Sequence, residues 1–312
     1  MRALLLTLAL AAVAPAHAEL RVFVASGLGG EPEYEQRFRE QAEAIAQAAG
    51  RSGAVPDNVV LLTGERTRRE TLQRELTAFV GKVQKDDQVV IVFIGHGSFD
   101  GADYRFNVPG PDVTGRDIAT ILDKLTATQQ LVVNATSSSG AVADEWKRPN
   151  RIVITATKSG GERNATRFAQ YWVEALTSPE ADRDKNETVT AEEAYEFAAR
   201  RVADTFKSDA ALATEHSRIE GGAPARFIVA RLSATAALPN DAALAAMMKE
   251  QSGIEAQIDD LKARKSSLPA DQYYNELEKV LLTLARLDKR IDERKGTLTG
   301  TQARESDEPK TR

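Results

Sequence analysis

Residues 89–98, VVIVFIGHGS, run apolar for six residues and then reach Gly95, His96, Gly97 and Ser98. A short apolar run rich in β-branched residues is typical of a strand that is buried on both faces. Two glycines around the histidine let the backbone turn sharply off the strand and leave the imidazole exposed. Such an imidazole suits proton transfer. The stretch therefore predicts a buried strand that ends in a candidate general base; the alternative is a histidine making one surface hydrogen bond.

Strands and helices alternate on both sides of this stretch, from residue 20 to about residue 230. The expected strands are rich in apolar residues, which favours a parallel sheet that is covered on both faces. The sequence therefore predicts a three-layer α/β sandwich with a mostly parallel sheet. Strands are expected at residues 20–25, 59–62, 88–94, 130–133, 151–156 and 226–230, and the main helices at 33–49, 69–83, 164–176 and 191–206.

A second cluster of polar side chains follows the next expected strand, in the stretch NATSSSGA at residues 134–141. The carboxyl ends of neighbouring parallel strands meet at one edge of a sheet, where binding sites form. We therefore expect His96 to lie about 4–8 Å from the hydroxyls of this cluster. These hydroxyls belong to Thr136, Ser137, Ser138 and Ser139.

The two stretches together resemble the caspase-like (clan CD) cysteine peptidases, above all the legumain family and its bacterial relatives. In that family a histidine after an apolar strand is the general base, and a cysteine after the next strand is the nucleophile. The resemblance covers roughly residues 20–230. It implies that His96 is the base and that Thr136 replaces the catalytic cysteine, with Ser137 and Ser138 as alternative hydroxyls.

The same resemblance implies residues for the substrate cleft. Backbone N–H groups around Gly97, Ser98 and Gly140 would form the oxyanion hole. The stretch YEQRFREQAE, residues 34–43, resembles the family's segment with an arginine that holds an acidic substrate side chain. Arg39 is the matching residue.

The chain contains no cysteine, so the thiolate that this family's reaction uses is absent. A hydroxyl attacks only when a base, an oriented partner for that base and an oxyanion hole are all in place. We therefore expect a pseudopeptidase that binds a peptide or protein partner through a degenerate active-site cleft. The alternative is a Ser/Thr-dependent peptidase or hydrolase with His96 as its general base.

Residues 182–193, DRDKNETVTAEE, resemble an EF-hand or dockerin-type calcium loop. Alternate oxygen ligands along such a loop converge on a hard cation. Glu187 departs from the pattern, because it occupies the position where glycine normally takes a positive φ. The alternative is an acidic loop in which Thr190 caps the next helix. The expected calcium ligands are Asp182, Asp184, Asn186, the carbonyl of Thr188, and Glu193.

The two ends of the chain differ from its middle. Residues 1–18 have a positive start, an apolar run and a small-x-small ending, which predicts a secretory signal peptide and a periplasmic or secreted protein. Residues 19–235 are expected to form the caspase-like domain. Residues 236–298 repeat apolar positions at three and four residues, which predicts a helical hairpin or coiled coil that self-associates or packs back on the domain. Residues 299–312 are polar and are expected to be disordered.

Composition narrows the classes of partner. Of 312 residues, 42% are hydrophobic and 28% charged, as in an ordinary soluble protein, and the net charge is −5. An acidic balance without a basic cluster argues against nucleic acid as partner. No apolar run after the start is long enough to cross a membrane, so we expect no transmembrane segment. Stability must come from the core, because no disulfide can form.

Overall fold

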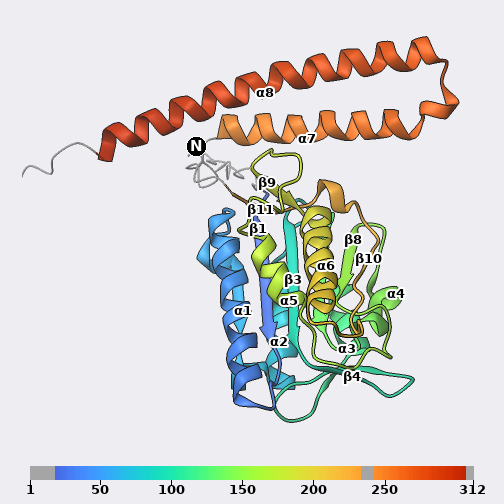
Figure 1. Cartoon of the computed structure of the whole chain (residues 1–312). Helices are drawn as coiled ribbons and strands as arrows, with labels where there is room; N and C mark the ends of the chain where they lie inside the picture. The colour runs from blue at the N-terminus through green and yellow to red at the C-terminus, as the bar shows by residue number, and fades with distance from the viewer. Residues whose placement is uncertain (1–17, 233–241, 307–312) are drawn as a thin grey trace, which may run out of the picture.

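A six-stranded sheet organises the first part of the chain in the computed structural model, which describes residues 18–232 and 242–306 (Figure 1). The strand order is β10-β8-β7-β3-β1-β2, and every neighbouring pair is parallel except β10 with β8. Its strands are β1 (Leu20–Ser26), β2 (Val59–Leu62), β3 (Gln88–Gly95), β7 (Gln129–Thr136), β8 (Arg151–Thr155) and β10 (Arg218–Glu220).

Helices cover both faces of this sheet, because the central strands are apolar on both sides. Along β3, Val90, Val92 and Ile94 belong to one buried cluster, and the residues between them belong to the other. The first cluster lies under α1 (Pro32–Arg51), α5 (Phe168–Ala175) and α6 (Ala191–Ser208). The second lies under α2 (Arg69–Lys82), α3 (Gly115–Leu122) and α4 (Ala143–Trp146). The predicted fold class, a three-layer α/β sandwich with a mostly parallel sheet, is confirmed.

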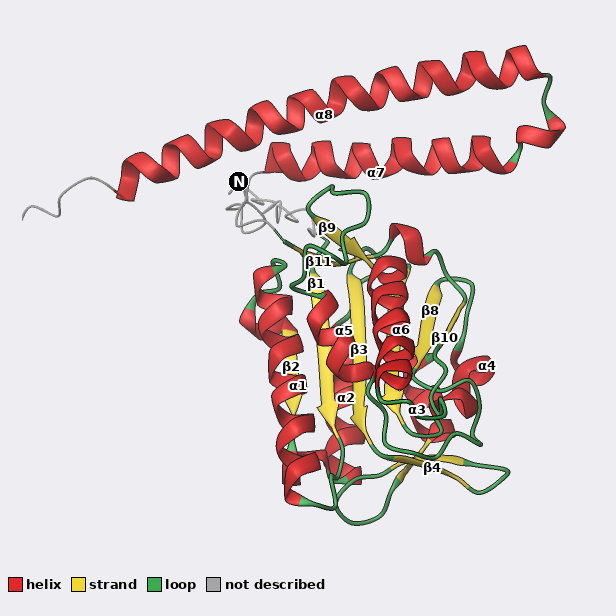
Figure 2. Ribbon diagram, in the orientation of Figure 1, coloured by secondary structure: helices red, strands yellow, loops and turns green. Residues whose placement is uncertain are grey.

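Two smaller sheets complete the sandwich (Figure 2). The strands β4 (Gly97–Phe99), β5 (Tyr104–Phe106) and β6 (Val113–Thr114) form an antiparallel sheet directly after β3. The strands β9 (Thr188–Thr190) and β11 (Ile228–Arg231) form an antiparallel pair. The strand expected at residues 226–230 is therefore β11, but it pairs with β9, and the edge of the main sheet is β10. Short 3-10 helices lie at Pro56–Asn58, Gly64–Thr67, Ser139–Val142, Pro224–Arg226 and Lys265–Ser267.

The C-terminal part is a helical hairpin of α7 (Ala242–Ala263) and α8 (Ala270–Ser306), as the apolar spacing predicts. It has an apolar cluster of its own, formed by Leu244, Ile254, Ile258, Leu287 and Ile291.

Several predicted boundaries fall at or beyond the edges of the described residues. The tail predicted from residue 299 is helical through Ser306. Three predicted features lie outside the described residues: the signal peptide before residue 18, the domain boundary near residue 235, and the end of the tail at residues 307–312. Among the helices that are described, none has both the length and the apolar character needed to span a membrane.

Candidate functional site

The two glycines beside His96 are required by close backbone contacts at the ends of β3 and β7. Gly95 has φ +141°, a conformation that other residues rarely adopt. At Gly97, an added Cβ would lie 2.4 Å from the carbonyl oxygen of Ser137 and 2.8 Å from the hydroxyl oxygen of Thr136. The Gly-His-Gly sequence therefore lets the chain leave the sheet while passing directly over the end of β7.

The His96 ring packs against α1. Its centroid lies 4.9 Å from that of Tyr34 and 5.1 Å from that of Phe38, both in edge-on geometry. Partial burial lowers the pKa of the His96 imidazole, and the nearby Arg37 guanidinium lowers it further, although a backbone hydrogen bond with Gly29 opposes them. A pKa below the usual value keeps the ring neutral at pH 7, which is the form that can accept a proton.

Thr136 lies at the end of β7, next to the end of β3, and its hydroxyl is held by a contact with Tyr104. The register pairs Gly95 with Thr136, so the two strand ends are adjacent, as expected. The Thr136 hydroxyl, however, lies 2.6 Å from the hydroxyl of Tyr104, which belongs to the cluster under α2 and α3. The His96 ring contacts α1 on the opposite face. The contacts of the two side chains thus lie in different buried clusters, and the expected distance of about 4–8 Å between His96 and the hydroxyls stays a prediction.

A buried hydrogen-bond network fixes the Thr136 hydroxyl. Asn134 and Thr136 are two residues apart in β7, so their side chains lie on the same face of the sheet. The Thr136 hydroxyl also donates to the side-chain oxygen of Asn134 at 2.8 Å, which fixes it on the face of Tyr104. Burial in this network raises the pKa of Tyr104 to about 12. Thr136 is thus a buried structural hydroxyl.

The serine turn, residues 137–140, is closed to solvent. Ser137 is 1% exposed, and Ser138 and Ser139 are fully buried. Ser138 has φ +57°, in the left-handed region. Neither Ser137 nor Ser138 has a hydrogen-bond partner for its hydroxyl among the described residues. Gly140, by contrast, donates its N–H to the Thr157 hydroxyl at 2.9 Å.

A cover formed by residues 157–162 lies against the serine turn. Ser138 donates its N–H to the main-chain oxygen of Glu162 at 2.8 Å. The carboxylate of Glu162 in turn accepts the N–H of His216 at 3.1 Å, and a second oxygen lies 2.5 Å from the His216 ring nitrogen Nδ1. Glu162 therefore ties the serine turn to a segment more than 50 residues further along the chain.

The remaining predicted cleft residues, Arg39 and Ser98, are exposed and do not contact the serine turn in any hydrogen bond of the described residues. Arg39 is exposed on α1. Arg37, two residues earlier, has its guanidinium carbon 4.4 Å from the centre of the Tyr34 ring, and its charge lowers the pKa of His96. Ser98 is exposed in β4, where its hydroxyl accepts a long 3.4 Å hydrogen bond from Asn107. The side-chain spacing could have found Arg37, because it follows Tyr34 by three residues and so shares its side of the helix.

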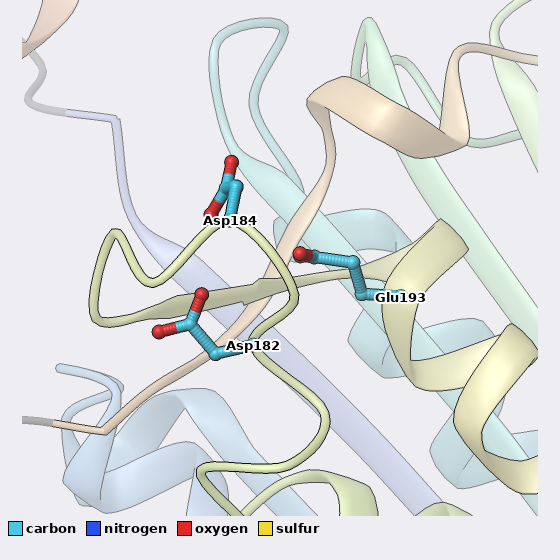
Figure 3. A group of neighbouring side chains, drawn as sticks. All are labelled: Asp182, Asp184 and Glu193. Carbon is cyan, nitrogen blue, oxygen red and sulfur yellow. The ribbon is translucent and has the colours of Figure 1, made fainter.

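The acidic loop brings together three of its five predicted calcium ligands (Figure 3). Carboxylate oxygens of Asp182, Asp184 and Glu193 lie within 4.8 Å of one another. Glu187 has φ +66°, the conformation that the loop pattern requires at this position. The side-chain oxygen of Asn186 instead accepts the N–H and the hydroxyl of Thr188.

The alternative reading of this loop is also realised in the structure. Thr190 caps α6 in a capping box, in which Glu193 accepts the Thr190 N–H. The three carboxylates are therefore close enough together to bind a hard cation, whereas the side-chain oxygen of Asn186 is hydrogen-bonded to Thr188 and does not join them. Calcium binding stays a prediction.

Calcium is expected to raise the thermal unfolding midpoint, with weak affinity on the order of 10⁻⁴ M. Burial and the Glu193 carboxylate raise the pKa of Asp184, so Asp184→Asn should relieve repulsion and raise the midpoint in chelator by a small amount. The same variant should lose most of the gain from calcium, because it loses a charged ligand. Melting curves in millimolar calcium and in chelator measure both effects, with the exposed Asp86→Asn as control. Identical midpoints in the two conditions would leave the loop as an acidic turn.

Comparisons with known proteins give a likeness of fold only. No family model matches the chain, and no curated protein matches it. The chain is similar to a structural genomics target from Geobacter sulfurreducens, with a TM-score of 0.46 and 11% identity over 69% of this chain and 100% of that one. It is also similar to caspase-1 from Spodoptera frugiperda, with a TM-score of 0.46 and 10% identity over 69% of this chain and 91% of that one. Likeness at this level carries nothing about chemistry, so the function has to be argued from the residues of this chain.

Proposed function

We propose that this chain is an exported, caspase-like pseudopeptidase that binds a peptide or protein partner without cleaving it. The observation that carries the proposal is the burial of the candidate nucleophiles, since Thr136, Ser137 and Ser138 are each no more than 1% exposed. A substrate carbonyl cannot reach a hydroxyl that has no exposed surface. The absence of any cysteine supports the same conclusion. Export is proposed from the signal-like residues 1–18.

The surface that we assign to the partner is the His96 surface, at the carboxyl ends of β1 and β3. Parallel α/β sheets bind ligands beyond these strand ends. Leu28 is 42% exposed there, and the Arg37 guanidinium stacks on the Tyr34 ring beside the imidazole. Aromatic residues and arginine are enriched in protein interfaces. The His96 surface consists of Leu28, Tyr34, Arg37 and His96.

A peptide-library screen for both binding and cleavage tests the proposal. We expect bound peptides with no new termini, and an affinity at least tenfold lower for His96→Ala and for Leu28→Asp. Arg51→Ala is the matched control, because this exposed arginine lies at the other end of the same helix and outside the His96 surface. Retention of full affinity in both surface variants would overturn the choice of surface.

A second candidate function, a serine-dependent hydrolase, is favoured by one observation. The buried hydroxyls of Ser137 and Ser138 have no hydrogen-bond partner among the described residues, although an unsatisfied buried polar group costs about 1–3 kcal/mol. Such a cost would be explained if the cover at residues 157–162 opens during a reaction. Peptide cleavage in the same screen that is lost in Ser137→Ala, together with a covalent adduct on Ser137 from an acyl-reactive probe, would establish this function in place of the first.

A further inference from the structure

Helix α8 carries apolar side chains over a wider arc than α7 covers. The two helices lie side by side along the hairpin (Figures 1 and 2). The side of α8 that packs in the hairpin cluster includes Leu277, Leu284 and Leu287. A two-stranded helical pair needs only such a narrow stripe, whereas a helix inside a larger bundle adds a further apolar position in each heptad. The apolar residues of α8 cover the wider arc, which is typical of a helix inside a larger bundle.

The additional apolar side chains form a second stripe, on a side of α8 that does not face the hairpin cluster. Tyr274 is 58% exposed, Leu281 45% and Leu282 50%. Between residues 274 and 289, a period of 3.6 residues places them on one side of the helix together with an exposed alanine and two exposed charged residues. The exposed Asp271 and Asp292 lie on the same side beyond this segment, and Lys289 also forms an ion pair with Glu293 at 4.0 Å. The outer stripe of α8 consists of Tyr274, Glu278, Leu281, Leu282, Ala285 and Lys289.

We propose that the outer stripe is the contact surface for a second copy of this chain, and that two hairpins associate through antiparallel α8 helices into a four-helix bundle. A two-fold axis brings the same patch of both copies together, so the patch must complement itself. With the axis between Leu282 and Ala285, Glu278 of each copy faces Lys289 of the other. The acidic residue thus precedes the leucines and the basic residue follows them, which is the charge order that an antiparallel self-contact requires.

The charge order also selects among possible occupants of the stripe. A parallel pair of α8 helices would set Glu278 against Glu278 and Lys289 against Lys289, which is unfavourable. A bundle of four helices would cover Leu281 and Leu282, which a single hairpin leaves half exposed. Burial of these side chains supplies the driving force for association.

Light scattering on the full-length protein after size-exclusion chromatography tests the proposal. We expect a dimer at 50 µM, and a monomer for Leu281→Lys with Leu282→Lys. The matched control is Thr283→Lys, because Thr283 is exposed and points away from the outer stripe, so this variant should remain dimeric. Circular dichroism at 222 nm checks that each variant keeps its helices. A wild-type monomer, or a leucine variant as dimeric as the wild type, would overturn the proposal.

Charge reversal tests the antiparallel register without touching the apolar residues. Lys289→Glu should raise the dimer dissociation constant about tenfold, because two carboxylates then face each other at both ends of the contact. Adding Glu278→Lys should restore the wild-type constant, since the pairs form again with reversed signs. Failure of the double variant to recover would exclude this register and with it the two-fold contact proposed here.

Discussion

The free energy of unfolding should rise by about 2.5 kcal/mol through Glu215 alone when the pH falls from 8 to 5. Glu215 is 5% exposed, and its carboxylate accepts the N–H groups of Arg167 and Phe168, at 2.8 and 2.9 Å, at the start of α5. Burial raises the pKa of Glu215 to about 7, against these hydrogen bonds, which lower it. The folded protein therefore binds the proton more tightly than the unfolded chain, whose Glu pKa is about 4.3.

The sign of this effect follows from the raised pKa. The contribution of Glu215 is fully present below the pKa of the unfolded chain and is lost as the pH rises through about 7. Other carboxylates oppose this effect. Hydrogen bonds and ion pairs lower the pKa values of Asp123 and Asp144, so the contribution of these two residues to the free energy of unfolding is lost as the pH falls. The effect must therefore be measured as a difference between the wild type and Glu215→Gln.

Urea denaturation at pH 5, 6, 7 and 8 makes this measurement. Glu215→Gln keeps one acceptor oxygen for the start of α5 and has no proton to gain, so the free energy of unfolding of the wild type minus that of the variant should be about 2.5 kcal/mol larger at pH 5 than at pH 8. The exposed Glu43→Gln serves as control and should follow the wild type. Parallel pH profiles for the wild type and Glu215→Gln would show that Glu215 does not titrate near neutrality.

The sequence predicts the central strands well and the outer ones poorly, for a physical reason. β3 is a continuous apolar run and β7 has the shorter run at residues 131–133, because both faces of each strand are buried. β10 has only three residues, all partly exposed, and therefore no apolar run to detect. β11 was expected as a strand, but a pattern of apolar residues does not say which strand is its partner. Pairing is decided by contacts that are distant in the sequence.

The candidate site was predicted only as far as local patterns reach. His96 lies at a strand end, as the Gly-His-Gly stretch predicts. The Tyr104 partner of the Thr136 hydroxyl was not predicted, because Tyr104 lies 32 residues away in the sequence and no motif joins the two. Glu162 and His216 were missed as partners, since they are 54 residues apart and no motif joins them.

Replacing Gly140 by alanine should destabilise the protein by about 3 kcal/mol or more. An added Cβ would lie 2.2 Å from the main-chain nitrogen of Ser159 and 2.3 Å from the carbonyl carbon of Lys158. These are backbone atoms, so no side-chain rotation relieves the clash. The cover would have to move, which would break the hydrogen bond from the Gly140 N–H to Thr157.

Urea denaturation of Gly140→Ala beside Gly81→Ala separates this clash from the general effect of replacing glycine. Gly81 lies exposed in α2 with nothing within 4 Å of an added Cβ, so alanine there should stabilise the protein by about 0.5–1 kcal/mol. A Gly140→Ala variant within about 0.5 kcal/mol of the wild type would mean that residues 157–162 shift at little cost. An easily displaced cover would expose Ser137 and favour the hydrolase. A large decrease in the free energy of unfolding would instead support a serine turn that stays buried in a protein that binds without cleaving.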